Sequence, residues 1–286
     1  MTTTAEAGRG AFTARQMLNK VPEVTFFFWV IKIMCTTVGE TAADFLNTSL
    51  GFGLTNTTYV TGALLAVLLL VQFRLRRYVP AVYWSVVVVI SVFGTLITDN
   101  LTDRFNVPLV TSTVVFAVVL AFVFAVWYAA ERTLSIHTIV TTRREGFYWL
   151  AILFTFALGT AAGDLVAEKA SLGYAISIAL FGAVIAVIAF MHYVVKVNPV
   201  LTFWLAYIMT RPLGASIGDE LSQNSHDYGG LGLGPTGTSY IFLACIFGLV
   251  AYLSLTKRDQ TPPDLIEAEE KRHEGRLAAE PEPSRP

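Results

Sequence analysis

Apolar residues fall into eight long blocks along the chain. Each block is long enough to cross the roughly 30 Å hydrocarbon core of a bilayer as a helix of about 20 residues. The blocks lie near residues 23–46, 58–75, 81–101, 108–130, 147–167, 174–195, 200–221 and 238–256. This pattern predicts an all-α membrane protein with an eight-helix transmembrane domain over residues 22–256. A cytoplasmic N-terminal segment (1–21) precedes it, and a Pro- and Glu-rich tail (257–286), typical of disorder, follows it.

One signature recurs four times in the odd-numbered blocks. An aromatic residue precedes a tryptophan, a glycine stands ten residues after the tryptophan, and an aspartate follows five residues later. The tryptophans are Trp29, Trp84, Trp149 and Trp204, the glycines Gly39, Gly94, Gly159 and Gly214, and the aspartates Asp44, Asp99, Asp164 and Asp219. The chain therefore divides into four two-helix repeats, near 22–77, 78–131, 145–196 and 198–256. Because each repeat holds two spans, all four cross the membrane in the same direction and are parallel repeats.

Composition agrees with a membrane protein: 54% of residues are hydrophobic, 14% are charged, and mean hydropathy is +0.59. The net charge of −1 and the lack of a basic patch with interleaved aromatics argue against nucleic acid as a partner. The two cysteines, Cys35 and Cys245, lie in apolar blocks without the spacing of a zinc site or a disulfide framework. No nucleophile–base pair, phosphate loop or cofactor motif is present, so we expect neither an enzyme nor a resident cofactor.

Basic residues gather on the tryptophan side of the blocks, whereas the opposite loops hold only Arg104 and Lys169. On the tryptophan side stand Arg9, Arg15, Lys20, Arg74, Arg76, Arg77, Arg132, Arg143, Arg144, Lys196, Lys257 and Arg258. The excess of positive charge predicts that both termini are cytoplasmic and that the aspartates point outward.

The tryptophan, glycine and aspartate of each repeat share one face of a helix. At 1.5 Å per residue the glycine lies about 15 Å, and the aspartate about 22 Å, beyond the tryptophan. The same face carries Lys32, Glu40 and Arg211. Small residues let helices approach closely, so we expect the odd-numbered helices to meet at the centre through their glycines. The even-numbered helices then face lipid, and the tryptophans anchor the repeats at the membrane interface.

The four aspartates and Glu40 predict an anionic layer within the outer third of the bilayer. Carboxylates in a membrane span are costly unless something compensates their charge. Lys32 and Arg211 offset part of it, as charge-tuning or substrate-binding groups. Hard oxygen ligands suit Mn²⁺, Ca²⁺ or Mg²⁺, and hydroxyls such as those of Thr36, Thr95 and Thr160 could complete the shell. The leading hypothesis is a divalent-cation transporter, with manganese export as the specific prediction and proton exchange as a compatible driving force.

Three other interpretations stay open. The aspartates could form a structural hydrogen-bond network rather than an ion site. Arg211, followed by Pro212, could bind an organic anion or another small solute, although an internal ion pair with Glu40 or an aspartate is the simpler interpretation. The protein could also be a non-transporting membrane scaffold or sensor that works through Arg132–Arg144 and the acidic tail. The lipid bilayer and a small cation are the expected partners, and a homo-oligomer is left open.

The fourfold signature with two spans per unit resembles a family of bacterial membrane proteins defined by this tandem repeat and its tryptophan. The resemblance covers roughly residues 22 to 256. It implies the eight-helix architecture and a multi-pass location in the bacterial inner membrane, but no established activity. The pairs Gly163–Asp164 and Gly218–Asp219 are also similar to the acidic helix motifs of manganese and calcium exporters, although those exporters typically have inverted repeats.

Overall fold

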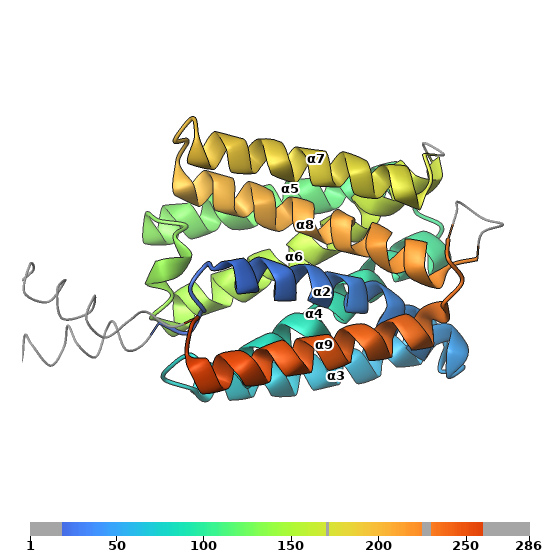
Figure 1. Cartoon of the computed structure of the whole chain (residues 1–286), viewed down its shortest axis with the longest axis horizontal. Coiled ribbons are helices and arrows are strands. Elements are labelled where there is room, and N and C mark those ends of the chain that lie inside the picture. The colour runs from blue at the N-terminus through green and yellow to red at the C-terminus, as the bar shows by residue number, and fades with distance from the viewer. Residues whose placement is uncertain (1–18, 170–171, 225–229, 260–286) are drawn as a thin grey trace, which may run out of the picture.

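The computed structural model of the chain describes residues 19–169, 172–224 and 230–259. The described part is helical and contains no strand. Its long helices are α2 (Phe26–Asp44), α3 (Gly53–Arg74), α4 (Pro80–Asp99), α5 (Leu109–Glu131), α6 (Thr142–Asp164), α7 (Tyr174–Tyr193), α8 (Pro199–Ser222) and α9 (Gly234–Thr256). All eight are long and apolar enough to span a membrane, which confirms the predicted fold class. They run side by side along the long axis of the molecule (Figure 1).

Local sequence explains several helix starts. The Thr25 side chain accepts a hydrogen bond from the Phe28 amide, and the Thr141 side chain accepts one from the Arg144 amide. Prolines occupy the first turn of α4, α8 and α9, where their missing N–H costs nothing. The helices α3, α6 and α9 begin four or five residues before the predicted blocks at 58, 147 and 238, because polar and small residues before each apolar block are part of the helix.

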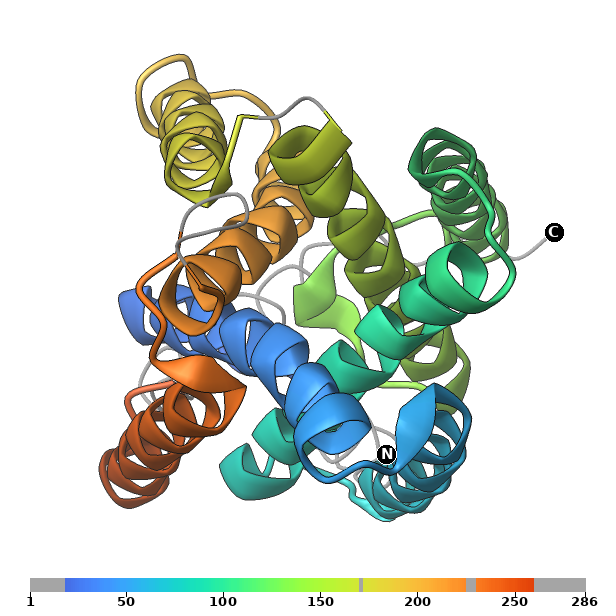
Figure 2. The ribbon, with the colours of Figure 1, turned by 90° about the vertical axis from the view of Figure 1, so that its right-hand side faces the viewer.

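Four helices form an inner ring and four form an outer layer (Figure 2). The inner helices are α2, α4, α6 and α8, and each contacts the next around the ring, with α8 closing onto α2. Between 56% and 61% of the residues in their spanning segments are buried, against 17% to 28% for α3, α5, α7 and α9. The odd-numbered spans therefore lie at the centre and the even-numbered spans outside, as predicted.

Each outer helix packs against the inner helix of the following repeat. Thus α3 packs on α4, α5 on α6 and α7 on α8, and α9 returns to pack on α2. The last repeat supports the first in the same way as each repeat supports its successor. The fold is accordingly a closed ring with fourfold cyclic pseudosymmetry, and the interface between α2 and α8, which we call the seam, is where the two ends of the chain meet.

Three of the four inner helices change geometry directly after their aspartate. A π-helical turn follows Asp44, Asp99 and Asp164, as η1 (Phe45–Ser49), η2 (Asn100–Arg104) and η4 (Leu165–Lys169). The fourth helix, α8, continues as an α-helix to Ser222. Such π turns are rare and gather at functional sites. We call this end of the ring the aspartate end and the opposite end the tryptophan end.

The tryptophan end is held together by contacts that the sequence did not predict. The buried Lys20 ammonium lies 2.7 Å from the Glu145 carboxylate, whose other oxygen accepts a hydrogen bond from Gln72. Tyr78 donates a 2.6 Å hydrogen bond to Asp259, which is 2% exposed. Of the tail predicted over residues 257–286, the structure describes residues 257–259, and residues 260–286, like residues 1–18, lie outside the described part of the chain.

Candidate functional site

The glycines of the signature receive side chains from the neighbouring inner helix. The residue seven positions after each tryptophan lies against the glycine of the preceding repeat, and the first repeat supplies this residue to the last. Gly39 faces Ser91, Gly94 faces Phe156, Gly159 faces Arg211 and Gly214 faces Thr36. A methyl group at any of the four glycines would be closer to these atoms than van der Waals contact allows. Each glycine therefore leaves the space that a side chain of the neighbouring inner helix fills, and these four contacts hold the ring together. We call the space at each glycine a socket.

Arg211 differs from its equivalents, Thr36, Ser91 and Phe156, because it carries a charge into the centre of the ring. Its side chain is fully buried. It reaches the residues that stand eleven positions after the tryptophan in the other three repeats, namely Glu40, Thr95 and Thr160. Nη2 lies 3.0 Å from the Glu40 carboxylate and 2.7 Å from the Thr160 hydroxyl, and it also donates to the Thr95 hydroxyl. Nη1 donates to the Thr36 carbonyl at 3.1 Å.

The Arg211–Glu40 ion pair therefore lies at the centre of the ring and crosses the seam. Arg211 belongs to α8 and Glu40 to α2, 171 residues apart in sequence. The threonines predicted as metal-shell hydroxyls instead surround the guanidinium. The internal ion pair that we considered as the simpler interpretation of Arg211 is present.

Lys32 lies one layer closer to the tryptophan end and is fully buried. Its Nζ is 4.3 Å from the centre of the Tyr207 ring and 4.6 Å from that of Phe156. Within the described residues no hydrogen-bond acceptor lies in reach of this Nζ. The two aromatic faces attract its charge, but they do not replace the hydrogen bonds an ammonium makes in water.

The tryptophans lie inside the ring rather than at its rim. Trp84, Trp149 and Trp204 are 2%, 3% and 4% exposed, and Trp29 is half-buried. They pack with the preceding aromatic residues, and the hydroxyls of Tyr83 and Tyr148 lie 2.6 Å apart. The sequence predicted these tryptophans as anchors of the membrane interface or of the repeats, and the three buried ones lie in the ring, where their aromatic pairs pack against those of neighbouring repeats. The rings form a packed aromatic layer at the tryptophan end.

The four aspartates converge at the opposite end. Asp219 is 8% exposed, and Asp44, Asp99 and Asp164 are half-buried. The charges of Glu40, Asp44 and Asp164 act on both Asp99 and Asp219. Across the seam, the Gln223 amide donates a 3.2 Å hydrogen bond to Asp44. The predicted anionic layer is thus an electrostatically connected group of five carboxylates, which we call the acidic cluster.

The acidic cluster does not have the arrangement of a metal centre. In residues 19–169, 172–224 and 230–259, no group of three or more His, Cys, Asp or Glu side chains is placed to hold a metal ion. Neighbouring carboxylates interact by charge without sharing one coordination sphere, and Glu40 is engaged by Arg211. The predicted metal ligands are therefore neighbours, but they form no preorganised metal site in the described structure.

Sequence reasoning placed these residues on one face but did not identify their partners. The position of each residue within its repeat was the available signal. Arg211 stands seven residues after its tryptophan, the position that fills a socket, and its hydrogen-bond partners Glu40, Thr95 and Thr160 each stand eleven residues after theirs. The buried Lys20–Glu145 pair had no such signal, because neither residue belongs to the signature. The four histidines also gave none, although His137 and His192 line a pocket described below.

Comparison with known proteins agrees with the repeat architecture. No curated protein and no solved structure shows significant similarity to the chain. The family described as Repeat of Unknown Function (DUF347) matches four times, over residues 27–78, 82–133, 147–198 and 202–259. Each match begins one residue before the aromatic pair of an inner helix and extends beyond the outer helix that follows. The chain therefore belongs to the Repeat of Unknown Function (DUF347) family and consists largely of four copies of its repeat.

Proposed function

We propose that the protein is a membrane transporter for a positively charged solute, and that the solute passes along the seam between α2 and α8. The observation that carries this proposal is the order of charges at the seam. The acidic cluster lies at one end, the Arg211–Glu40 ion pair lies in the middle, and Lys32 lies beyond it. Intramembrane ionisable residues commonly mark the route of an ion or a substrate.

The seam is the joint best suited to open. Every other pair of neighbouring inner helices belongs to consecutive repeats, and a single outer helix connects them along the chain. The first and last inner helices are joined only by packing and side-chain contacts. Lys32, Glu40 and Arg211 are charged at positions where the other repeats have uncharged residues, and all three belong to the first or the fourth repeat. A ring that opens at the seam would expose these groups while the other three joints stay closed.

The ion pair would act as the gate. A cation drawn into the acidic cluster competes with Arg211 for Glu40, and so does a proton. Either event weakens the main electrostatic contact across the seam, because an unpaired guanidinium is costly to keep buried. Exchange of the solute for protons at Glu40 is then the natural coupling. In this arrangement the tryptophan end faces the cytoplasm of a bacterial cell, as the basic loops indicate.

Manganese export, the specific cargo expected from the sequence, is the less favoured version of this proposal because the acidic cluster is not arranged as a metal centre. An organic-anion carrier based on Arg211 is less favoured as well. Its guanidinium is occupied by Glu40 and by the oxygens of three threonines. A monovalent or organic cation needs no closed coordination shell. Carboxylates that attract it by their combined negative charge, without all binding it directly, are therefore sufficient.

Uptake and efflux in proteoliposomes test the proposal. Mn²⁺, Na⁺, tetraphenylphosphonium and an organic acid such as benzoate are assayed with and without a proton gradient. We expect transport of a cation, its loss in Glu40→Gln and in Asp219→Asn, and its retention in Asp103→Asn. Asp103 is the matched control because it is an exposed carboxylate at the same end of the molecule. Its charge also acts on Asp44 and Asp99, but from an exposed position where solvent screens it, and its replacement removes none of the five carboxylates of the acidic cluster.

Each other result contradicts the proposal in a distinct way. Transport of benzoate alone would favour the anion carrier. Transport of Mn²⁺ alone would restore the metal hypothesis. No transport of any probe, together with a requirement for the tail in cells, would favour a scaffold or sensor.

A further inference from the structure

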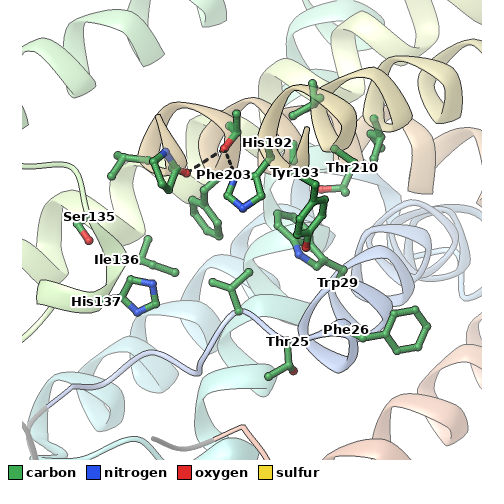
Figure 3. A pocket seen from close by; sticks show the side chains of 18 of the residues that line it. Thr25, Phe26, Trp29, Ser135, Ile136, His137, His192, Tyr193, Phe203 and Thr210 are labelled. Carbon is green, nitrogen blue, oxygen red and sulfur yellow. Dashed lines mark hydrogen bonds between the residues drawn. The ribbon is translucent and has the colours of Figure 1, made fainter. Parts of the chain in front are cut away.

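A pocket of about 550 Å³ opens beside the seam at the tryptophan end of the molecule. The start of α2, the linker before α6, the end of α7 and the start of α8 line it (Figure 3). Its deeper wall is apolar and includes Ile33, Ile188 and Ala189. Phe26 and Tyr193, at its edge, are 78% and 70% exposed, so the pocket opens sideways from the helix bundle. Its volume falls in the range of small-molecule sites, roughly 300–1,000 Å³.

Aromatic rings form the inner part of the pocket. Trp29 and Phe203 lie 5.6 Å apart between ring centres, and both line the cavity. Figure 3 shows their rings and that of His192 around the same space. The electron-rich faces of such rings attract cations, and tryptophan does so most strongly. The polar groups decide which charge the pocket accepts.

His192 brings an imidazole ring to the pocket. Its Nδ1 lies 2.8 Å from the Thr202 hydroxyl, which is also within hydrogen-bonding distance of the carbonyls of Asn198 and Pro199. This contact holds the ring in place at the pocket wall. An imidazole is a polar group that carries no permanent charge.

Negative charge lies at the rim. The Glu23 carboxylate is 3.7 Å from Nδ1 of His137, which lines the pocket beside Ser135. The described lining contains histidines but no lysine, arginine, aspartate or glutamate. A cation entering the pocket would find aromatic faces, imidazole rings and a nearby carboxylate. An anion would find no permanent positive charge.

We propose that this pocket binds an amphipathic organic cation, that is, an apolar or aromatic body bearing an ammonium-like or phosphonium-like charge. The apolar body lies against Ile33, Ile188 and Ala189, and the charge lies among the aromatic rings on the side nearer Glu23. The sideways opening allows entry from the surrounding apolar phase, where such molecules accumulate. Nothing in the acidic cluster is needed for this binding.

The pocket also reaches the seam. Thr210 lines it, the Thr210 carbonyl accepts a hydrogen bond from Thr36 of α2, and the next residue along α8 is Arg211. A bound cation therefore lies next to the contacts that hold the seam closed. That the pocket is the loading site for transport rests on the proposed function, whereas the binding of a cation to the pocket does not.

Equilibrium binding to the purified full-length protein in detergent tests the inference. The probe is tetraphenylphosphonium, and its counterpart of nearly the same shape and opposite charge is tetraphenylborate. We expect saturable binding of the cation only. Ala189→Phe should weaken it about tenfold or more by filling the pocket. Ala186→Phe is the matched control, because it adds the same group to the exposed face of the same helix. Glu23→Gln should weaken binding a few-fold, and less at high salt.

Equal binding of both ions, or equal effects of Ala189→Phe and Ala186→Phe, would overturn the inference. A tightly held phospholipid that tetraphenylphosphonium does not displace would identify the pocket as a lipid groove instead. Thermal unfolding of each variant checks that it folds. His192→Ala changes a second residue of the pocket lining and tests the same site independently of Ala189→Phe. Binding that Ala189→Phe abolishes without affecting cation transport would leave the site in place but reject its loading role. Transport that fails while binding persists would reject the proposed function alone.

Discussion

Replacement of Glu40 by glutamine should destabilise the ring at its centre. Arg211 is fully buried, and Glu40 is its only carboxylate partner among the described ion pairs. Removing one member of a buried ion pair costs about 3–5 kcal/mol, because the remaining charge stays buried without compensation. The glutamine oxygen still accepts a hydrogen bond, and the three threonine contacts remain. We therefore expect the lower end of that range, about 3 kcal/mol.

The double variant Glu40→Gln/Arg211→Met separates a charge effect from a packing effect. Methionine fills part of the space of the arginine stem and leaves no buried charge. Replacement of a whole buried ion pair by neutral groups is often close to neutral. The double variant should then be more stable than Glu40→Gln alone, with a coupling energy of about 2 kcal/mol or more between the two sites.

Thermal unfolding of the purified protein in detergent measures this cycle. At roughly 2–4 °C per kcal/mol for a domain of this size, Glu40→Gln should lower the midpoint by about 6–12 °C. Glu131→Gln is the control, because Glu131 pairs with Arg143 and Arg144 at the surface of the molecule, where all three side chains keep access to solvent, and its replacement should change stability less than Glu40→Gln does. Additive losses in the double variant, or a midpoint for Glu40→Gln equal to that of the parent, would refute the reasoning.

Three further outcomes follow from the packing and charges described above. Gly159→Ala places a methyl group 2.5 Å from Cβ of Arg211 and should cost about 1–3 kcal/mol in unfolding experiments. Gly248→Ala meets open space on α9 and should be neutral or stabilising by up to about 1 kcal/mol, so equal effects of the two would contradict the socket arrangement. Lys32→Met should raise the unfolding midpoint, because it removes a buried ammonium without an acceptor; a lower midpoint would show that its aromatic contacts outweigh that loss. Burial raises the pKa of Asp259 above 3.8 despite its hydrogen bond from Tyr78, so the folded state holds this proton more tightly than the unfolded state. Stability should therefore fall as pH rises from about 3.8 through the raised pKa. The Glu23 amide donates to the Asp259 backbone carbonyl, and its hydrogen-exchange protection, corrected for the intrinsic pH dependence of exchange, should fall over that window in the parent but not in Asp259→Asn.

The repeat architecture was predictable because four features kept the same spacing in every copy. The interval from Trp29 to Asp44 recurs three times, and membrane composition alone does not place an aspartate at a constant offset. The face bearing the glycine then had to be the contact face, since a carboxylate and a small residue share it. The central position of α2, α4, α6 and α8 follows from this argument without any tertiary information.

The neighbours of each helix were not predictable in the same way. Nothing in the sequence of α3 distinguishes packing on α2 of its own repeat from packing on α4 of the next, because loop geometry decides between them. The burial of three tryptophans was not predictable for a related reason. An aromatic pair such as Tyr83–Trp84 suits both a lipid headgroup region and a crowded ring, and only the arrangement of all four pairs selects the ring.

The candidate site could be predicted in part. An internal partner for Arg211 was expected, and Glu40 was among the named possibilities. In the described part of the chain, Lys32 lacks a hydrogen-bond acceptor because Glu40 pairs with Arg211 instead. The spacing of residues in the sequence does not show which of the two cations pairs with Glu40. The absence of a metal centre in the described residues depends on distances between side chains from four helices, which sequence spacing along one helix cannot supply.

The return of α9 to α2 has a consequence for biosynthesis. During synthesis α2 enters the bilayer first, with Lys32 and Glu40 on the face that later becomes the centre of the ring. Both Arg211 and the helix that covers the other side of α2 are made more than 170 residues later. Until the fourth repeat is complete only α4 can cover α2, and the sides of α2 that α8 and α9 later bury stay uncovered. Truncation within the fourth repeat should therefore be far more damaging than the loss of a quarter of the helices would suggest.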